Sequence, residues 1–225
     1  MNKLGFIVNP CDMCVANKVI EGKLCTILWH VNDFKVSHPN KTVVYQVVAD
    51  LKERYGKIDV KHGPEQIFVG MDITFLQSGE VKFYMKGHVE NAIDDFPEEI
   101  FSPRTSPASD GVFTVSSTSQ VLDDDSGKLF HSIFANLLFI SRRAGPDIQV
   151  AIGFLENRVT CATQEDWIKL KCVLEYLKNT IEMPLTLGMN DTSLVSWWVD
   201  ASYGVHLDMK SQTGGVRSFG KGAAY

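Results

Sequence analysis

The chain lacks the features that mark membrane, secreted and disulfide-stabilised proteins. No apolar run in its 225 residues reaches the roughly 18 to 20 residues that a membrane-spanning helix requires. The N-terminus also lacks the basic and then apolar layout of a secretory signal. The five cysteines are odd in number and irregularly spaced, which argues against a disulfide framework. We therefore expect an intracellular protein, cytoplasmic or nuclear, with no membrane partner.

Common signatures of catalysis and nucleotide binding are missing as well. The sequence has no glycine-rich phosphate loop, no Gly-x-Ser-x-Gly elbow and no pair of histidines at helical metal spacing. Its net charge is −5, so the overall field does not indicate nucleic-acid binding. What remains is a globular composition with 44% hydrophobic residues, enough for one large core or two modest ones.

The most informative segment that is present covers residues 25–37. β-Branched and aromatic residues alternate on both sides of Asn32-Asp33, and this pattern predicts a hairpin with that pair at its turn. Taken alone, Asn-Asp is an ordinary turn dipeptide. Clustered carboxylates at such a position would instead hold the metal ions of a two-metal polymerase.

Five motifs, in the same order, resemble those of copia-type retrotransposon reverse transcriptases. His30-Val31-Asn32-Asp33 is similar to the Tyr/His-Val-Asp-Asp hairpin of that family, and Asn9-Pro10-Cys11 before it is similar to Asp-Pro-Cys. The other four motifs are similar to the primer-grip segment, the Arg-Pro-Asp-Ile motif, the Trp…Val-Leu-x-Tyr-Leu-Lys-Gly-Thr helix and the opening of the ribonuclease H domain. They occupy residues 67–73, 146–148, 165–180 and 198–215.

The resemblance implies an α+β fold, and the apolar spacing predicts its elements. The implied parts are a partial reverse-transcriptase palm and the start of a thumb (1–100), a linker (101–126), a helical connection (127–190) and the first strands of a ribonuclease H-like domain (191–225). Periodicity predicts a helix over 42–55 ended by Gly56 and strands over 67–75, 80–85 and 194–199. It also predicts helices near 128–143, 147–158 and 166–180, the last capped by Thr163.

The resemblance also implies roles for individual residues. The positions of Asn32, Asp33 and Asp200 would be catalytic, and the two carboxylates among them would bind Mg²⁺. Phe68-Val69-Gly70 would grip the primer of an RNA–DNA hybrid or template-primer. From the residues alone, 68–70 is a buried strand and Asp200 an ordinary strand-end residue. We also expect Arg142 and Arg143 to contact nucleic acid, as part of a basic stripe on neighbouring helices. The alternative interpretation of these basic residues is an ordinary solvated helical surface. The other members of this stripe are Arg158, Lys169, Lys171 and Lys178.

These observations lead to one main hypothesis about function. The chain is a fragment of a copia-type RNA-directed DNA polymerase with an incomplete ribonuclease H, inactive as it stands and completed, if at all, by the upstream part of the polyprotein. The departures from the family are Asn32 at a metal position, Gly145 in place of Arg, and truncation at both ends. The alternatives are a non-enzymatic remnant that binds nucleic acid or protein, and an untranslated relic. We expect the apolar residues of 43–51 and Trp197-Trp198 to be partly uncovered.

Overall fold

The computed structural model describes residues 1–101, 104–109, 111–191, 194–204 and 211–223. It divides the chain into two compact units, Met1–Val69 and Gly70–Tyr225. The sequence predicted divisions near residues 101, 127 and 191, and all three fall inside the second unit. The reason is that the segment around 101–126 and the helices that follow it share one core.

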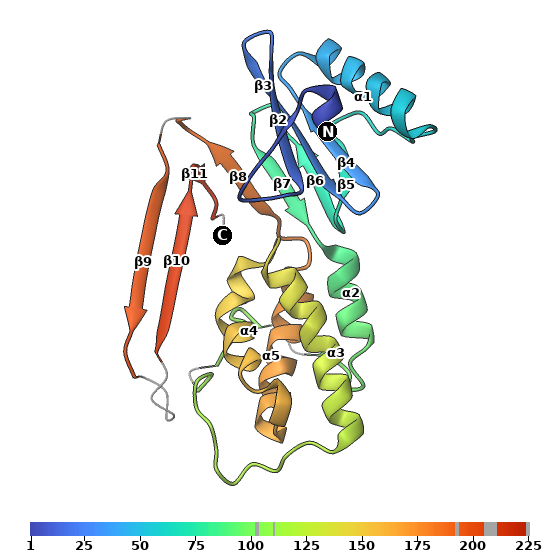
Figure 1. Cartoon of the computed structure of the whole chain (residues 1–225). Helices are drawn as coiled ribbons and strands as arrows, with labels where there is room; N and C mark the ends of the chain where they lie inside the picture. Colours follow the sequence, from blue (N-terminus) through green and yellow to red (C-terminus); the bar gives the residue numbers. More distant parts are fainter. Residues whose placement is uncertain (102–103, 110, 192–193, 205–210, 224–225) are drawn as a thin grey trace. The chain divides into compact units, whose positions relative to one another are not determined.

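The first unit is an antiparallel sheet with one helix on it (Figure 1). Helix α1 (Lys41–Tyr55) buries Val43, Val47 and Leu51 in a core that also contains Cys25 and Ile27 of the sheet. The predicted helix and its end at Gly56, where φ is 85°, are confirmed. The strands are β1 (Ile7–Val8), β2 (Val15–Ile20), β3 (Lys23–His30) and β4 (Asp33–Ser37), paired in the order β1-β2-β3-β4, and β5 (Glu65–Phe68) lies at the end of the unit.

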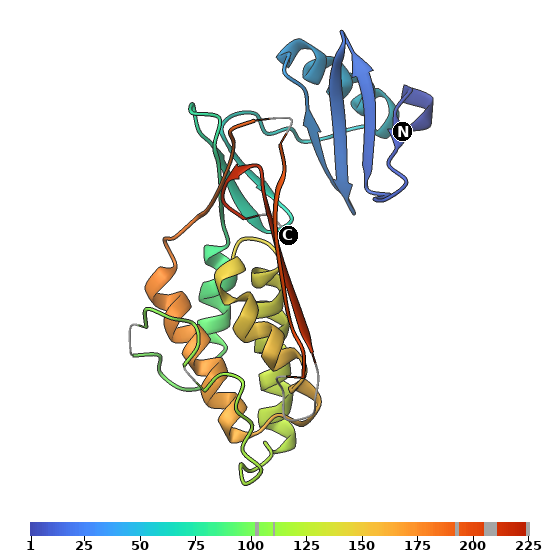
Figure 2. The same ribbon diagram turned by 90° about the vertical axis from the view of Figure 1, so that its left-hand side faces the viewer.

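The second unit combines a helical core, strands in the order β11-β8-β7-β6, and a separate hairpin of β9 and β10 (Figure 2). Its strands are β6 (Met71–Phe75), β7 (Val81–Tyr84), β8 (Leu185–Met189), β9 (Ser196–Ser202), β10 (Gln212–Ser218) and β11 (Gly220–Lys221). Its helices are α2 (Lys86–Asp94), α3 (Asp124–Ser141), α4 (Gln149–Glu156) and α5 (Gln164–Thr180). Short 3₁₀ turns occur at Pro146–Ile148 and Val159–Cys161 of this unit and at Asn2–Leu4 of the first unit.

The helical core is formed largely by α3 and α5. Phe130, Ile133 and Leu137 of α3 are fully buried, as are Leu170 and Leu174 of α5. The predicted cap of α5 is confirmed in detail, because the Thr163 side chain accepts a hydrogen bond from the Asp166 amide while the Asp166 carboxylate accepts one from the Thr163 amide. No helix in the described part of the chain is both long and apolar enough to cross a membrane.

The segment predicted as a linker is attached to the helices rather than free. Val112 is buried in the core, and the Ser116 amide donates to Oε2 of Glu165 over 2.9 Å. Nε of Arg104 lies 2.5 Å from Oε2 of Glu175 on α5. The described residues of this segment form turns and irregular backbone, to which Ser, Thr and Pro are suited.

Helix α2 and strands β8, β10 and β11 of the second unit were not predicted as individual elements, and the prediction of uncovered faces was partly wrong. Helix α2 and strand β8 are short, and α2 buries only Val89 and Ala92. Val43, Val47 and Leu51 are covered by the sheet of their own unit, whereas Val44 and Val48 of the same helix are half-buried. Trp197 and Trp198 of β9 are about 60% exposed, as expected.

Candidate functional site

The β3–β4 hairpin carries the predicted metal position at its tip. His30 pairs with Asp33, so the two turn residues are Val31 and Asn32, and Asp33 is the first residue of β4. The prediction that Asn32-Asp33 forms the turn is therefore wrong by one residue. Val31 has φ of 52°, a left-handed conformation that is costly for a β-branched residue and that hairpin turns usually assign to glycine or asparagine. Both Asn32 and Asp33 are exposed.

The tip offers one carboxylate and one amide oxygen to a cation. Among the residues that the structure describes, no three His, Cys, Asp or Glu side chains are grouped closely enough to hold a metal ion. Asp33 belongs to the first unit and Asp200 to the second.

Asp200 lies within a strand and not at its end. It is the fifth residue of β9 and pairs with Gly214 of β10, so no side chain stands opposite it. Its Oδ1 accepts a hydrogen bond of 2.9 Å from the Ala201 amide, and the residue is exposed. The carboxylate is thus accessible from solvent, which is compatible with a ligand role.

The predicted primer-grip segment forms a tight turn. Phe68 ends β5, and Val69 and Gly70 have φ of 52° and 74° before β6 begins at Met71. The predicted single strand over 67–75 is thus interrupted, and Phe68 and Val69 are half-buried. A Cβ atom on Gly70 would lie 2.6 Å from Nε2 of the His88 side chain, and the positive φ of Gly70 favours glycine.

Arg142 and Arg143 differ in their surroundings. Nη2 of Arg142 lies 3.6 Å from Oε2 of Glu156, and the side chain is 57% exposed. The guanidinium of Arg143 stacks 3.5 Å from the centroid of the Phe139 ring, and burial lowers the pKa of this guanidinium. Arg142 is therefore more accessible to a phosphate than Arg143.

The other four cations of the predicted stripe bind groups of the protein itself. Nζ of Lys171 lies 2.5 Å from Oε2 of Glu98, and the bond holds the pKa of this carboxyl below its usual range, aided by the Trp167 indole. Nζ of Lys178 donates to the Ile100 carbonyl over 2.6 Å. Arg158 pairs with Asp166 and Lys169 donates to the Thr114 carbonyl. These cations tie the 95–123 segment to α5 or hold the start of α5.

Sequence reasoning did not identify a groove beside the hairpin in the first unit. It has a volume of about 840 Å³ and runs between β4, α1 and the residues from Ile58 to Phe68, with Asn32 and Asp33 at its rim. Inside it, Nζ of Lys35 donates to Oε1 of Gln66 over 2.6 Å, and burial lowers the pKa of this lysine. The Tyr45 and His62 rings meet edge to face at 4.9 Å.

Two curated proteins are similar to the chain over most of its length. One is the retrovirus-related Pol polyprotein from transposon TNT 1-94 of Nicotiana tabacum, 23% identical over 99% of the chain and 17% of that protein. The other is the putative transposon Ty5-1 protein YCL074W of Saccharomyces cerevisiae, 24% identical over 86% of the chain and 62% of that protein. The chain thus spans less than two thirds of either relative. No protein-family model and no solved structure matches it. These two similarities support a transposon origin for the chain.

Proposed function

We propose that this chain is a segment of a copia-type reverse transcriptase, with the first strands of a ribonuclease H-like domain, whose polymerase metal site is degenerate. The observation that carries the proposal is the β3–β4 hairpin. Its strained Val31-Asn32 turn leads directly into Asp33, so a single carboxylate stands where the resembled family places two. The similarity to transposon Pol proteins supports the same assignment.

The loss of one carboxylate is sufficient to abolish two-metal chemistry. Two-metal phosphoryl transfer requires anionic oxygens that clamp both ions against the attacking and leaving oxygens. The amide of Asn32 contributes one neutral oxygen, so the tip loses one unit of negative charge together with a ligand. Every ~1.4 kcal/mol of transition-state stabilisation that is lost lowers the rate tenfold. In the ribonuclease H-like part, Asp200 is the proposed counterpart of the first metal-binding carboxylate, and it needs further acidic partners.

Titration with Mn²⁺ tests the assignment of the hairpin tip. In the unaltered chain, Mn²⁺ is expected to broaden the amide NMR signals of residues 30–34 only at millimolar concentration. Asn32→Asp is expected to increase the affinity about thirtyfold, since a second unit charge ~4 Å from a divalent ion contributes about 2 kcal/mol even in water. The control is Gln77→Glu, which adds a carboxylate at the exposed β6–β7 turn. Tight binding by the unaltered chain, or equal gains in the two variants, would contradict the assignment.

A non-enzymatic nucleic-acid-binding remnant is the second candidate, and the exposure of Arg142 favours it. If it is correct, an RNA–DNA hybrid binds weakly and without sequence preference, and the double substitution Arg142→Ala and Arg143→Ala reduces the salt slope. Each lost phosphate contact lowers the slope of log affinity against log salt by about 0.7 to 0.9. Lys128→Ala, which removes an exposed cation at the other end of α3, serves as the control. An unchanged slope in the double variant would exclude these arginines from the contact surface.

A further inference from the structure

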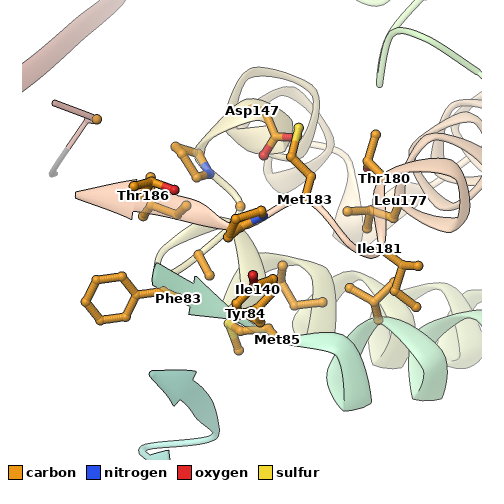
Figure 3. Close-up of a pocket in the computed structure, with 17 residues that line it drawn as sticks. Phe83, Tyr84, Met85, Ile140, Asp147, Leu177, Thr180, Ile181, Met183 and Thr186 are labelled. Carbon is orange, nitrogen blue, oxygen red and sulfur yellow. The ribbon is translucent and has the colours of Figure 1, made fainter. Parts of the chain in front are cut away.

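The second unit contains a pocket of about 240 Å³ that the proposed function does not use. It is bounded by β7 and β8, by the C-terminal ends of α3 and α5, and by the turn at Pro146–Ile148. In Figure 3, Asp147 and Met183 lie next to each other on one side, and Leu177 and Ile181 lie together on another. The volume corresponds to roughly eight water molecules at their share of the liquid, which is room for a small organic molecule.

The walls of this pocket are mainly apolar. Four buried side chains line it: Met85 just before α2, Val89 on α2, Ile140 on α3 and Leu177 on α5. The polar groups are few. A pocket with apolar walls and a small number of convergent polar groups is the usual form of a small-molecule site.

Asp147, an exposed residue, is the one Asp, Glu, Lys, Arg or His among the described residues that line the pocket. Its Oδ2 accepts a hydrogen bond of 2.6 Å from the Tyr176 hydroxyl. Burial, and then the hydrogen bond to Asp147, raises the pKa of Tyr176 to about 12, so the phenol stays protonated at neutral pH and remains the donor. This bond holds the carboxylate at the pocket, and within the described part of the chain no group donates a hydrogen bond to Oδ1.

We propose that this pocket binds a small organic monocation with an apolar body, of the arylalkylammonium class. The ammonium group pairs with Oδ1 of Asp147, and the apolar body lies against Ile140 and Leu177. Because no cation of the described residues lines the pocket, its charge favours a cation over a neutral molecule of the same shape and disfavours an anion. The proposal is independent of the polymerase assignment, since it concerns other residues in the other unit.

The test uses the full chain with ¹³C-labelled methionine methyl groups and phenethylammonium as the probe. Saturable shifts are expected at Met85 and Met183, which line the pocket, with a dissociation constant on the order of a millimolar for a ligand of this size. Met13, exposed in the first unit, is the internal control and is expected to stay unchanged. 2-Phenylethanol should bind more weakly, and 3-phenylpropionate should not bind measurably.

Asp147→Asn examines the charge directly. It should weaken the binding of phenethylammonium roughly fivefold, the magnitude of a partly exposed ion pair, and leave 2-phenylethanol unaffected. The preference for the cation over the alcohol is measured on the unaltered chain, so the test stands even if the variant does not fold. Equal binding of cation and alcohol, shifts at Met13 as large as at Met85, or an unchanged affinity in Asp147→Asn would overturn the proposal.

Discussion

Asp166→Ala is expected to lower the free energy of unfolding of the second unit by about 3–5 kcal/mol, the range for removing one partner of a buried ion pair. The Asp166 side chain is 2% exposed. It accepts hydrogen bonds of 2.9 Å from the amide and from the hydroxyl of Thr163, and it pairs with Arg158 at 3.2 Å. The substitution therefore removes the capping box of α5 and leaves a largely buried guanidinium without its carboxylate.

Urea denaturation followed by far-UV circular dichroism measures this loss. Asp166→Asn is expected to be intermediate, because an amide oxygen can still accept the Thr163 bonds but brings no charge to Arg158. The control is Asp125→Ala. The Asp125 carboxylate is 95% exposed and pairs with Lys128 on α3, so the free energy of unfolding is expected to change by less than about 0.5 kcal/mol. A loss below about 1 kcal/mol for Asp166→Ala would show that the ion pair and cap are not formed as described.

Leu170→Ala is the second large effect, with an expected loss of about 2–5 kcal/mol. Leu170 is fully buried in the helical core of the second unit, so the truncation removes transfer free energy and leaves a cavity. Ile168 lies two residues away on the same helix but is 60% exposed, so Ile168→Ala is expected to change stability by no more than about 0.5 kcal/mol.

The contrast between these two variants tests the orientation of α5. It is measured by the same urea denaturation, at one temperature and protein concentration. Similar losses for Leu170→Ala and Ile168→Ala, or a larger loss for Ile168→Ala, would mean that α5 presents a different face to the core.

The sequence predicted the elements whose determinants lie within a few residues. The helix that ends at Gly56 and the helix capped by Thr163 were predicted because a positive φ and a side-chain cap act within a single turn. The β3–β4 hairpin was predicted from the alternation of its strands, but its register was not. Pairing of His30 with Asp33 depends on which residue accepts the left-handed turn conformation, and here a valine does so.

The features that were not predicted depend on contacts between distant residues. The irregular segment before α3 is held by Glu98 with Lys171 and by Arg104 with Glu175, pairs more than 70 residues apart. Composition carries no information about such pairs, so the segment was interpreted as a linker and its cationic partners as a nucleic-acid surface. The pocket beside Asp147 is likewise formed by elements far apart in sequence.

The resemblance to reverse transcriptases supplied the candidate site, and its residues fall in both units of the chain. Asn32 and Asp33 lie together at one hairpin tip, whereas Asp200 belongs to the other unit. Restoring the lost carboxylate by Asn32→Asp would give two adjacent acidic residues.

Primer extension tests the central claim most directly. The purified chain is incubated with a primed RNA template, all four deoxynucleoside triphosphates and Mg²⁺ or Mn²⁺, and the products are resolved by length. We expect no extension above a control without protein, either for the unaltered chain or for Asn32→Asp, because two-metal transfer needs more carboxylates than this tip supplies. Extension by the unaltered chain, or its appearance with Asn32→Asp alone, would contradict the account.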